Sequence, residues 1–193
     1  MDPELIINEV LTKEVLADVL KENHSKSDIR ELTRKANRKY VKVRDVYELT
    51  LEHEDPQVVF RSAWLLENIF FDYPEEFEYV QPLFFKDYSR QKNKSAQRHY
   101  SKIAKEVTYS AQMCLRDIKP GNFDVILEGS FDWLIDPETP VAVKCNCLDV
   151  LYNLSEQEDW ILPELKNILE QNLLSNSAAL LSRTKSILKK LKP

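Results

Sequence analysis

The chain has 193 residues, 43% of them hydrophobic and 31% charged, which is enough for a substantial core, so we expect residues 1–193 to form a single domain. The formal net charge of -5 argues against a general nucleic-acid binder, and the two glycines, Gly121 and Gly129, are too few for the glycine-rich loops that hold phosphates. No apolar run reaches the roughly 20 residues that span a bilayer. The first residues also lack the basic segment of a signal peptide, so we predict a cytoplasmic protein.

The cysteines and histidines form no recognisable metal or redox pattern. Cys145 and Cys147 lie two residues apart in an apolar helical stretch, and with Cys114 they make an odd number, so we predict reduced side chains in the core. The histidines are His24, His53 and His99. None of them is four residues from another or close to a cysteine, and the sequence therefore predicts no metal site and no cofactor.

Apolar residues recur at three- and four-residue spacing along most of the chain, which predicts helices and no sheet. The interruptions fall at turn or cap residues and divide the chain into helices that we group into five pairs. The first pair covers about 3–20, with room for a break, and 27–40, with Ser27 as the N-cap of its second helix. The second pair covers 43–54 and 56–71, where Asp55 supplies a cap and Pro56 a first helical position that wastes no hydrogen bond.

The remaining three pairs follow the same alternation. The third covers 74–88 and 95–113, and the polar residues 89–94 between its helices predict a mobile linker. The fourth covers 123–135 and 140–154, and the fifth covers 160–172 and 177–191. Successive pairs begin roughly 35 to 40 residues apart, a period typical of stacked helical repeats.

Two pairs carry similar segments before their second helix. Residues 55–61 read Asp-Pro-Gln-Val-Val-Phe-Arg, and residues 136–144 read Asp-Pro-Glu-Thr-Pro-Val-Ala-Val-Lys. This segment resembles the HEAT repeat pattern, in which an Asp in the turn precedes an Arg by six residues. Asp55 and Arg61 match that spacing, whereas Asp136 and Lys144 match it only with two inserted residues, and the other pairs lack the motif.

The resemblance implies an irregular HEAT-like or armadillo-like fold, that is, an all-α, right-handed α-solenoid of about five antiparallel helix pairs. It also implies that the first helices form an outer layer and that the second helices line an inner, concave layer. Structural roles in the repeat are implied for Asp55, Pro56, Arg61, Asp136, Pro137 and Lys144.

Charge is distributed unevenly between the two sets of helices. The first helices with their flanks (2–25, 41–55, 72–89, 119–137 and 155–173) hold 25 acidic and 7 basic residues, and the rest of the chain holds 7 acidic and 20 basic residues. If the second helices line one face, that face is basic and attracts acidic peptides or phosphates. Its expected partner-binding residues are Arg34, Arg38, Arg61, Arg98, Lys102, Lys144, Arg183 and Lys185. The alternative is a solvated surface in which these bases only pair with neighbouring acids.

Aromatic residues are concentrated in the middle of the chain, where 60–88 contain ten of the nineteen. Their spacing along helical stripes predicts packing between neighbouring helices for most of them. Tyr73 and Tyr79 lie at a loop end, from which a side chain can reach a partner.

These observations favour a non-enzymatic scaffold that binds an acidic protein or peptide. One alternative is a protein similar to the HEAT-like DNA glycosylases that act on alkylated bases, with Trp64 and Glu67, or Trp133 and Asp132, in the catalytic parts. It predicts that a tryptophan and an acid converge on the basic face. A second alternative is an assembly module without a ligand groove, and we assign no catalytic residue.

Overall fold

The computed structural model describes residues 10–22, 25–113, 123–157 and 159–191. Within these ranges all regular secondary structure is helical, comprising α1 to α11 and the short 3-10 helix η2. The predicted all-α fold is therefore confirmed. The chain divides into two compact units, residues 1–99 and 100–193.

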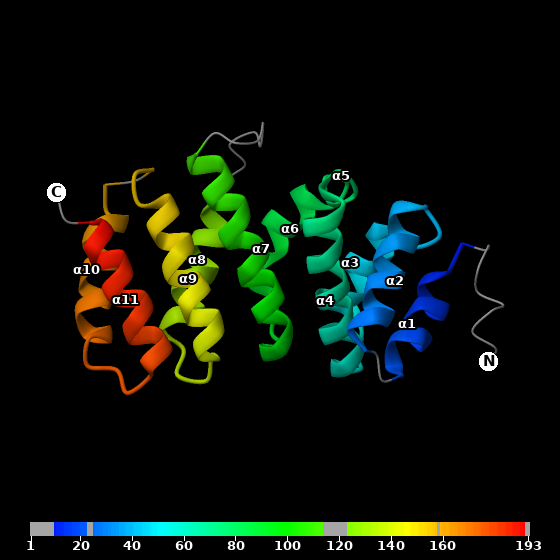
Figure 1. Ribbon diagram of the computed structural model, residues 1–193, viewed down its shortest axis with the longest axis horizontal. Coiled ribbons are helices and arrows are strands. Elements are labelled where there is room, and N and C mark those ends of the chain that lie inside the picture. The colour runs from blue at the N-terminus through cyan, green and yellow to red at the C-terminus, as the bar shows by residue number, and fades with distance from the viewer. Residues whose placement is uncertain (1–9, 23–24, 114–122, 158, 192–193) are drawn as a thin grey trace. The chain divides into compact units, whose positions relative to one another are not determined.

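The first unit contains two helical hairpins, the broken first helix of the third predicted pair and the start of α7. Its elements are α1 (Lys13–Lys21), α2 (Lys26–Asn37), α3 (Val43–Glu52), α4 (Pro56–Asp72), α5 (Pro74–Phe77), α6 (Gln81–Asp87) and η2 (Tyr88–Arg90). The hairpin α3–α4 is packed along its length, α2 lies against α4, and α1 lies against α3 and α4 (Figure 1). The second helices α2 and α4 therefore pack against each other, and so do the first helices α1 and α3, as in a stack of hairpins.

The second unit contains the remainder of α7 (Lys94–Gln112) and two further hairpins. These are α8 (Asp124–Ile135) with α9 (Val141–Leu154), and α10 (Ile161–Asn172) with α11 (Ala178–Lys190). Helices α9 and α11, the second helices of their pairs, lie side by side (Figure 1). The same arrangement of hairpins therefore recurs in both units.

The first two helices begin at other residues than predicted. Helix α1 starts at Lys13 rather than near residue 3, with Thr12 as its N-cap, and the predicted residues 3–9 lie outside the described ranges. Ser25, not Ser27, caps α2: its Oγ accepts from the backbone N–H of Asp28, and the Asp28 carboxylate accepts from the N–H of Ser25 at 2.7 Å. The residue three after Ser27 is Arg30, which has no acceptor to complete this reciprocal pair.

The helix predicted over 74–88 is broken in two. Helix α5 ends at Phe77, and α6 begins at Gln81 with Pro82 in its first turn. In a continuous helix Pro82 offers no N–H to the carbonyl of Glu78, and its ring collides with that carbonyl. The chain avoids this conflict by turning between Glu78 and Val80.

The side chains of the linker 89–94 are hydrogen-bonded to backbone groups, which argues against the predicted mobility. Gln91 is buried, and its Nε2 donates to the backbone carbonyl of Thr50 at 2.8 Å. Asn93 donates from Nδ2 to the carbonyl of Pro56 at 3.0 Å, while its Oδ1 accepts from the N–H groups of Ser95 and Ala96 at the start of α7. The polar residues that suggested mobility bond to backbone instead of water.

Aromatic side chains form the core beside this break, as their spacing predicted. Phe77 packs edge-on against Phe70 and Phe84 at centroid distances of 5.0 and 5.4 Å, and Phe84 contacts Tyr88 at 5.9 Å. These four side chains are at most 2% exposed. Tyr79 is the opposite case, since it is 74% exposed.

None of the helices in the described part of the chain is long and apolar enough to cross a bilayer.

Candidate partner-binding site

The repeat motif of the second pair is used to fix helices in place. Asp55 caps α4 by accepting from the backbone N–H of Gln57 at 2.8 Å, and Pro56 takes the first helical position. Arg61 is only 8% exposed, and its Nη1 donates to the carbonyl oxygens of Leu20 and Lys21 at the end of α1. Arg61 was also expected on the basic face; its burial gives it a structural position instead.

The corresponding turn of the fourth pair repeats only the first half of this arrangement. Asp136 accepts from the N–H of Glu138 at 2.9 Å and from the hydroxyl of Thr139 at 3.2 Å, and exposed Pro137 lies within the turn. Lys144 is half-buried, and its ammonium group makes no hydrogen bond or ion pair with the residues that are described. The two motif bases therefore have different surroundings.

Counting from the start of the helix finds a different counterpart for Arg61. Arg61 is the sixth residue of α4, and the sixth residue of α9 is Asn146. Asn146 donates from Nδ2 to Ser101 Oγ on α7 at 3.0 Å. A polar tie to another helix thus recurs at this position with an amide in place of a guanidinium.

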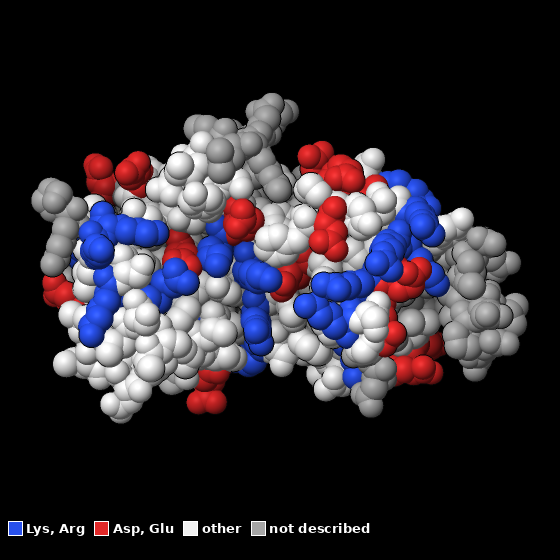
Figure 2. All heavy atoms as spheres, in the orientation of Figure 1, with Lys and Arg blue, Asp and Glu red and all other residues white. Residues whose placement is uncertain are grey.

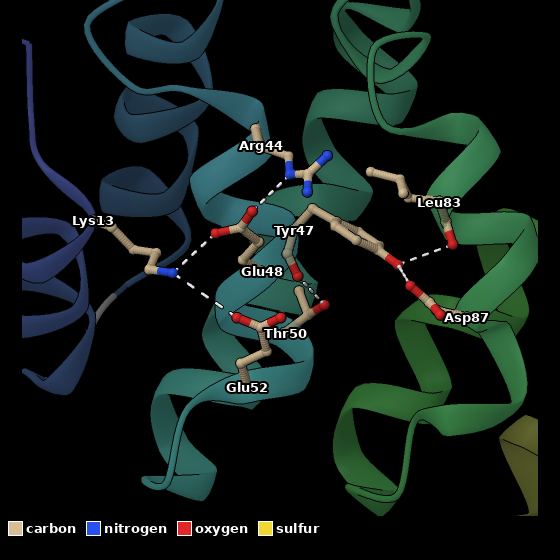
Figure 3. Close-up of polar contacts among 8 residues, drawn as sticks. All are labelled: Lys13, Arg44, Tyr47, Glu48, Thr50, Glu52, Leu83 and Asp87. Carbon is tan, nitrogen blue, oxygen red and sulfur yellow. Dashed lines mark hydrogen bonds and ion pairs between the residues drawn. The ribbon is translucent and has the colours of Figure 1, made fainter.

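Two acids of α3 are paired with local bases. Figure 3 shows Lys13 of α1 between two carboxylates of α3, at 2.9 Å from Glu48 and 3.9 Å from Glu52. Arg44 lies 2.6 Å from the other oxygen of Glu48. Hydrogen bonds from Arg44 and then Lys13 lower the pKa of the Glu48 carboxyl. The charge of Glu48 is therefore matched within this layer.

Tyr47 ties the same layer to α6. Its hydroxyl donates to the Asp87 carboxylate at 2.8 Å and lies 2.9 Å from the carbonyl oxygen of Leu83 (Figure 3). Arg90 lies 3.0 Å from the second oxygen of that carboxylate. Asp87 is therefore engaged within the protein.

The basic residues of α2 have fewer counter-ions. Figure 2 shows Lys and Arg side chains gathered over this helix. Arg34 pairs with Glu31 at 3.1 Å, but both side chains are more than half exposed, so solvent weakens the attraction. The exposed guanidinium groups of Arg30 and Arg38 make no ion pair or hydrogen bond within the described ranges. An anion approaching α2 meets two uncompensated positive charges.

Two further predicted residues, Arg98 and Lys102, lie one turn apart on α7. Both side chains are exposed. The unit boundary falls between them, at His99 and Tyr100, within the same helix.

In the second unit the bases converge on one buried acid. Arg183 of α11 lies 3.4 Å from the carboxylate of Asp149 on α9, and Lys105 of α7 lies 4.0 Å from it. Burial raises the pKa of the Asp149 carboxyl, although Arg183 and Lys105 act in the opposite direction. Arg183 thus has an internal partner, while Lys185, two residues later, is exposed.

A groove in the first unit adds a residue that the sequence analysis missed. It has a volume of about 550 Å³ and is lined by Arg30 and Arg34 of α2 and by Phe71, Asp72 and Tyr73 at the end of α4. Phe71 is 41% exposed and Tyr73 half-buried. Arg30 could have been found from its spacing, because residues four apart lie on the same helical face as each other.

The residues proposed for base excision have other contacts. Half-buried Trp64 stacks on Phe60 at 6.3 Å, and the Glu67 carboxylate lies 2.5 Å from Nδ1 of His99, which is itself buried. These residues do lie on a second helix, but the acid is already hydrogen-bonded. The other pair lies on the first helix α8, where Trp133 is buried and only Asp132 is exposed.

The cysteines are free thiols where the structure describes them. Cys147 is a buried free thiol and Cys145 a half-buried one, while Cys114 lies outside the described ranges. In the described part of the chain, no three or more His, Cys, Asp and Glu side chains are grouped to hold a metal ion.

Comparison with known proteins places the chain in a family. A sequence model described as a HEAT repeat domain matches residues 16–191, so the protein belongs to the HEAT repeat family. No curated protein and no solved structure is significantly similar to it. HEAT repeats in general suggest a protein-interaction scaffold, and the family thus supports the broad functional prediction.

Proposed function

We propose that this protein is a non-enzymatic scaffold that binds an acidic peptide or protein through bases of its second helices. The residues proposed for this surface are Arg34, Arg38, Arg98, Lys102, Lys144, Arg183 and Lys185. The observation that carries the proposal is the contrast between the two layers of the first unit. Glu48 of α3 is paired with two bases, whereas Arg38 of α2 has no counter-ion in the described ranges.

An acidic protein fits this surface better than a nucleic acid. Nucleic-acid binding of useful strength requires many simultaneous phosphate contacts, which a net charge of -5 and acid-rich first helices oppose over longer distances. A short acidic segment needs only a few bases. A cytoplasmic location, expected from the sequence, forms part of this proposal.

Charge reversal on one set of helices tests the proposal. The variant Arg34→Glu/Arg98→Glu/Lys102→Glu changes three exposed bases of α2 and α7. The matched control Lys42→Glu/Lys86→Glu/Lys166→Glu makes the same change in net charge at three exposed positions of the first helices and their flanks. Each protein is used to capture partners from cell lysate at low and high salt, and the recovered protein and nucleic acid are analysed separately.

We expect the wild type and the control to retain an acidic protein at low salt and to release it at high salt. The α2/α7 variant should lose that protein while its melting temperature stays unchanged. Equal capture by both variants would contradict the proposal and favour a merely solvated basic surface. Recovery of nucleic acid that the α2/α7 variant loses would favour the glycosylase-type alternative.

A further inference from the structure

We infer that the groove between α2 and the end of α4 is the anchoring site for a partner segment that combines acidic and apolar side chains. This inference rests on the proposed scaffold function and gives it a specific location. The groove residues are Arg30, Arg34, Phe71, Asp72 and Tyr73.

The two arginines supply the anion-binding side. Arg30 and Arg34 project from the same face of α2, because they are separated by one helical turn. A guanidinium group binds a carboxylate through two parallel hydrogen bonds, and this geometry is stronger and more directional than contact with a point charge. Arg30 makes no competing ion pair in the described ranges, and the competing pair of Arg34 with Glu31 is exposed and therefore weak.

The end of α4 supplies the apolar side. The ring of Phe71 packs edge-on against buried Phe70 at 5.0 Å and yet remains 41% exposed. The backbone N–H of Tyr73 donates to the carbonyl of Ile69 at 2.8 Å, which fixes the end of the helix. A fixed and partly exposed aromatic surface binds an apolar side chain without a large loss of conformational entropy.

Asp72 determines which kind of anion fits. Its exposed carboxylate lines the same groove as the arginines, so a ligand with dense negative charge, such as a phosphodiester chain, is repelled. A peptide avoids this repulsion, since its carboxylates are spaced by backbone N–H groups that can donate to Asp72. The volume of about 550 Å³ lies within the range of small-ligand sites and suits a few side chains of such a peptide.

The test uses fluorescence anisotropy with a short fluorescein-labelled peptide in which glutamates alternate with leucines. A second probe has serine in place of every leucine, and a third is a fluorescein-labelled single-stranded oligonucleotide. The groove variant is Arg30→Ala/Arg34→Ala. Its matched control, Lys26→Ala/Lys35→Ala, removes two other bases of α2, neither of which lines the groove or belongs to the proposed binding surface. Alanine preserves helix propensity, and circular dichroism checks that both variants fold.

We expect the groove variant to raise the Kd of the glutamate–leucine peptide by about tenfold or more, and the control to change it by less than about threefold. Phe71→Ser should weaken the binding of the leucine-containing peptide but not the binding of the serine-containing one.

Other results overturn the inference and are distinguishable. If the groove variant and its control lost equal, salt-sensitive amounts of peptide affinity, the groove would not be the anchoring site, but the basic-surface proposal would still stand. If neither peptide bound saturably to the wild type at low salt, both the groove and the basic-surface proposal would be refuted. Tighter binding of the oligonucleotide than of the peptides would refute the assigned partner class.

Discussion

The guanidinium group of Arg61 lies 2.7 Å from the carbonyl oxygen of Leu20, and the same nitrogen lies 2.8 Å from that of Lys21. These carbonyls lie at the C-terminal end of α1, where the helix itself provides no donors. The contact spans about forty residues in sequence and attaches the first hairpin to the second. The base of the HEAT motif therefore acts here as a cap for a neighbouring repeat.

Replacing Arg61 by methionine should cost stability rather than partner binding. Two charge-assisted hydrogen bonds, one buried and one partly buried, are lost, so Arg61→Met is expected to lower the free energy of unfolding by about 2 to 4 kcal/mol. Arg38→Met, at an exposed position, should change it by less than about 0.5 kcal/mol. Urea denaturation followed by circular dichroism measures both, and similar effects in the two variants would mean that the Arg61 contacts contribute little.

Linker 89–94 should resist trypsin in spite of its basic residues. Arg90, Lys92 and Lys94 are potential cleavage sites, but the Gln91 and Asn93 side chains hold this backbone against Thr50 and Pro56. Gln91→Ala removes one of these ties and should increase the rate of cleavage after Arg90 or Lys92 by about tenfold. Peptide mapping by mass spectrometry gives the rates. Rapid cleavage of the wild type at these sites would indicate the mobile linker that the sequence suggested.

The expectation of a single domain predicts one cooperative unfolding transition for both units. Helix α7 crosses the boundary between residues 99 and 100 without interruption, so unfolding of one unit frays a helix of the other. The tryptophans distinguish the units: Trp133→Phe/Trp160→Phe leaves only Trp64 in the first, and Trp64→Phe leaves reporters only in the second. Coincident urea midpoints by fluorescence are expected. Separate midpoints, with circular dichroism showing two steps, would establish two domains.

Asp149 should make stability depend on pH in a direction opposite to that of most carboxylates. Burial raises its pKa above the ordinary value of 3.8, with Arg183 and Lys105 opposing, so the folded protein binds this proton more tightly than the unfolded chain. Its stabilising contribution is complete below the unfolded pKa and is lost as the pH rises through the folded pKa. Asp149→Asn should therefore be more stable than the wild type at pH 7, and this difference should shrink toward pH 4. A variant less stable at pH 7 would mean that the ion pairs outweigh burial.

Cys147 should be unreactive in the folded protein. Burial raises the pKa of its thiol to about 12, so only about one side chain in ten thousand is a thiolate at pH 8. Cys145 is half-buried, and burial raises its pKa as well, against the opposing charge of Arg183. Iodoacetamide labelling with peptide mapping should modify Cys145 before Cys147 under native conditions and both at equal rates in urea. Equal native rates would show that the α9 core opens readily.

The helices could be predicted where one local signal decides them. Asp55 and Pro56 specify a cap and a first turn by themselves, and α4 begins where they indicated. Ser25 and Ser27 are chemically equivalent, and only the acceptor on Asp28 selects between them. Pro82 was visible in the sequence, but the apolar stripe of the aromatic residues runs through it and hid the break. For the linker, polar composition did not show whether the side chains bond to water or to the protein. In the structure their partners are backbone carbonyls of distant residues.

The candidate site was predicted less well because residue type does not determine which way a side chain faces. Arg61 and Arg34 carry the same group on second helices, yet one is buried beneath α1 and the other is exposed. Arg183 was recognised as basic, but its partner Asp149 lies on another helix and could not be assigned from spacing. The helical periodicity of α2 could have identified Arg30 as a neighbour of Arg34. Its association with Phe71 and Tyr73 depended on how α2 packs against α4.

The turn before α9 also bears on how repeats of this type are aligned. Asp136 accepts hydrogen bonds from Glu138 and Thr139 within the turn itself, and these two contacts do not fix the number of residues to the following helix. Helix α9 starts at Val141, whereas α4 starts directly after Asp55. A count of six residues from Asp136 ends at Ala142, and a match by charge selects Lys144. Both pass over Asn146, which makes the interhelical bond. Divergent repeats are therefore better aligned from the first residue of their second helices. This alignment pairs residues with the same structural role, such as Arg61 and Asn146, even when they differ in charge and identity.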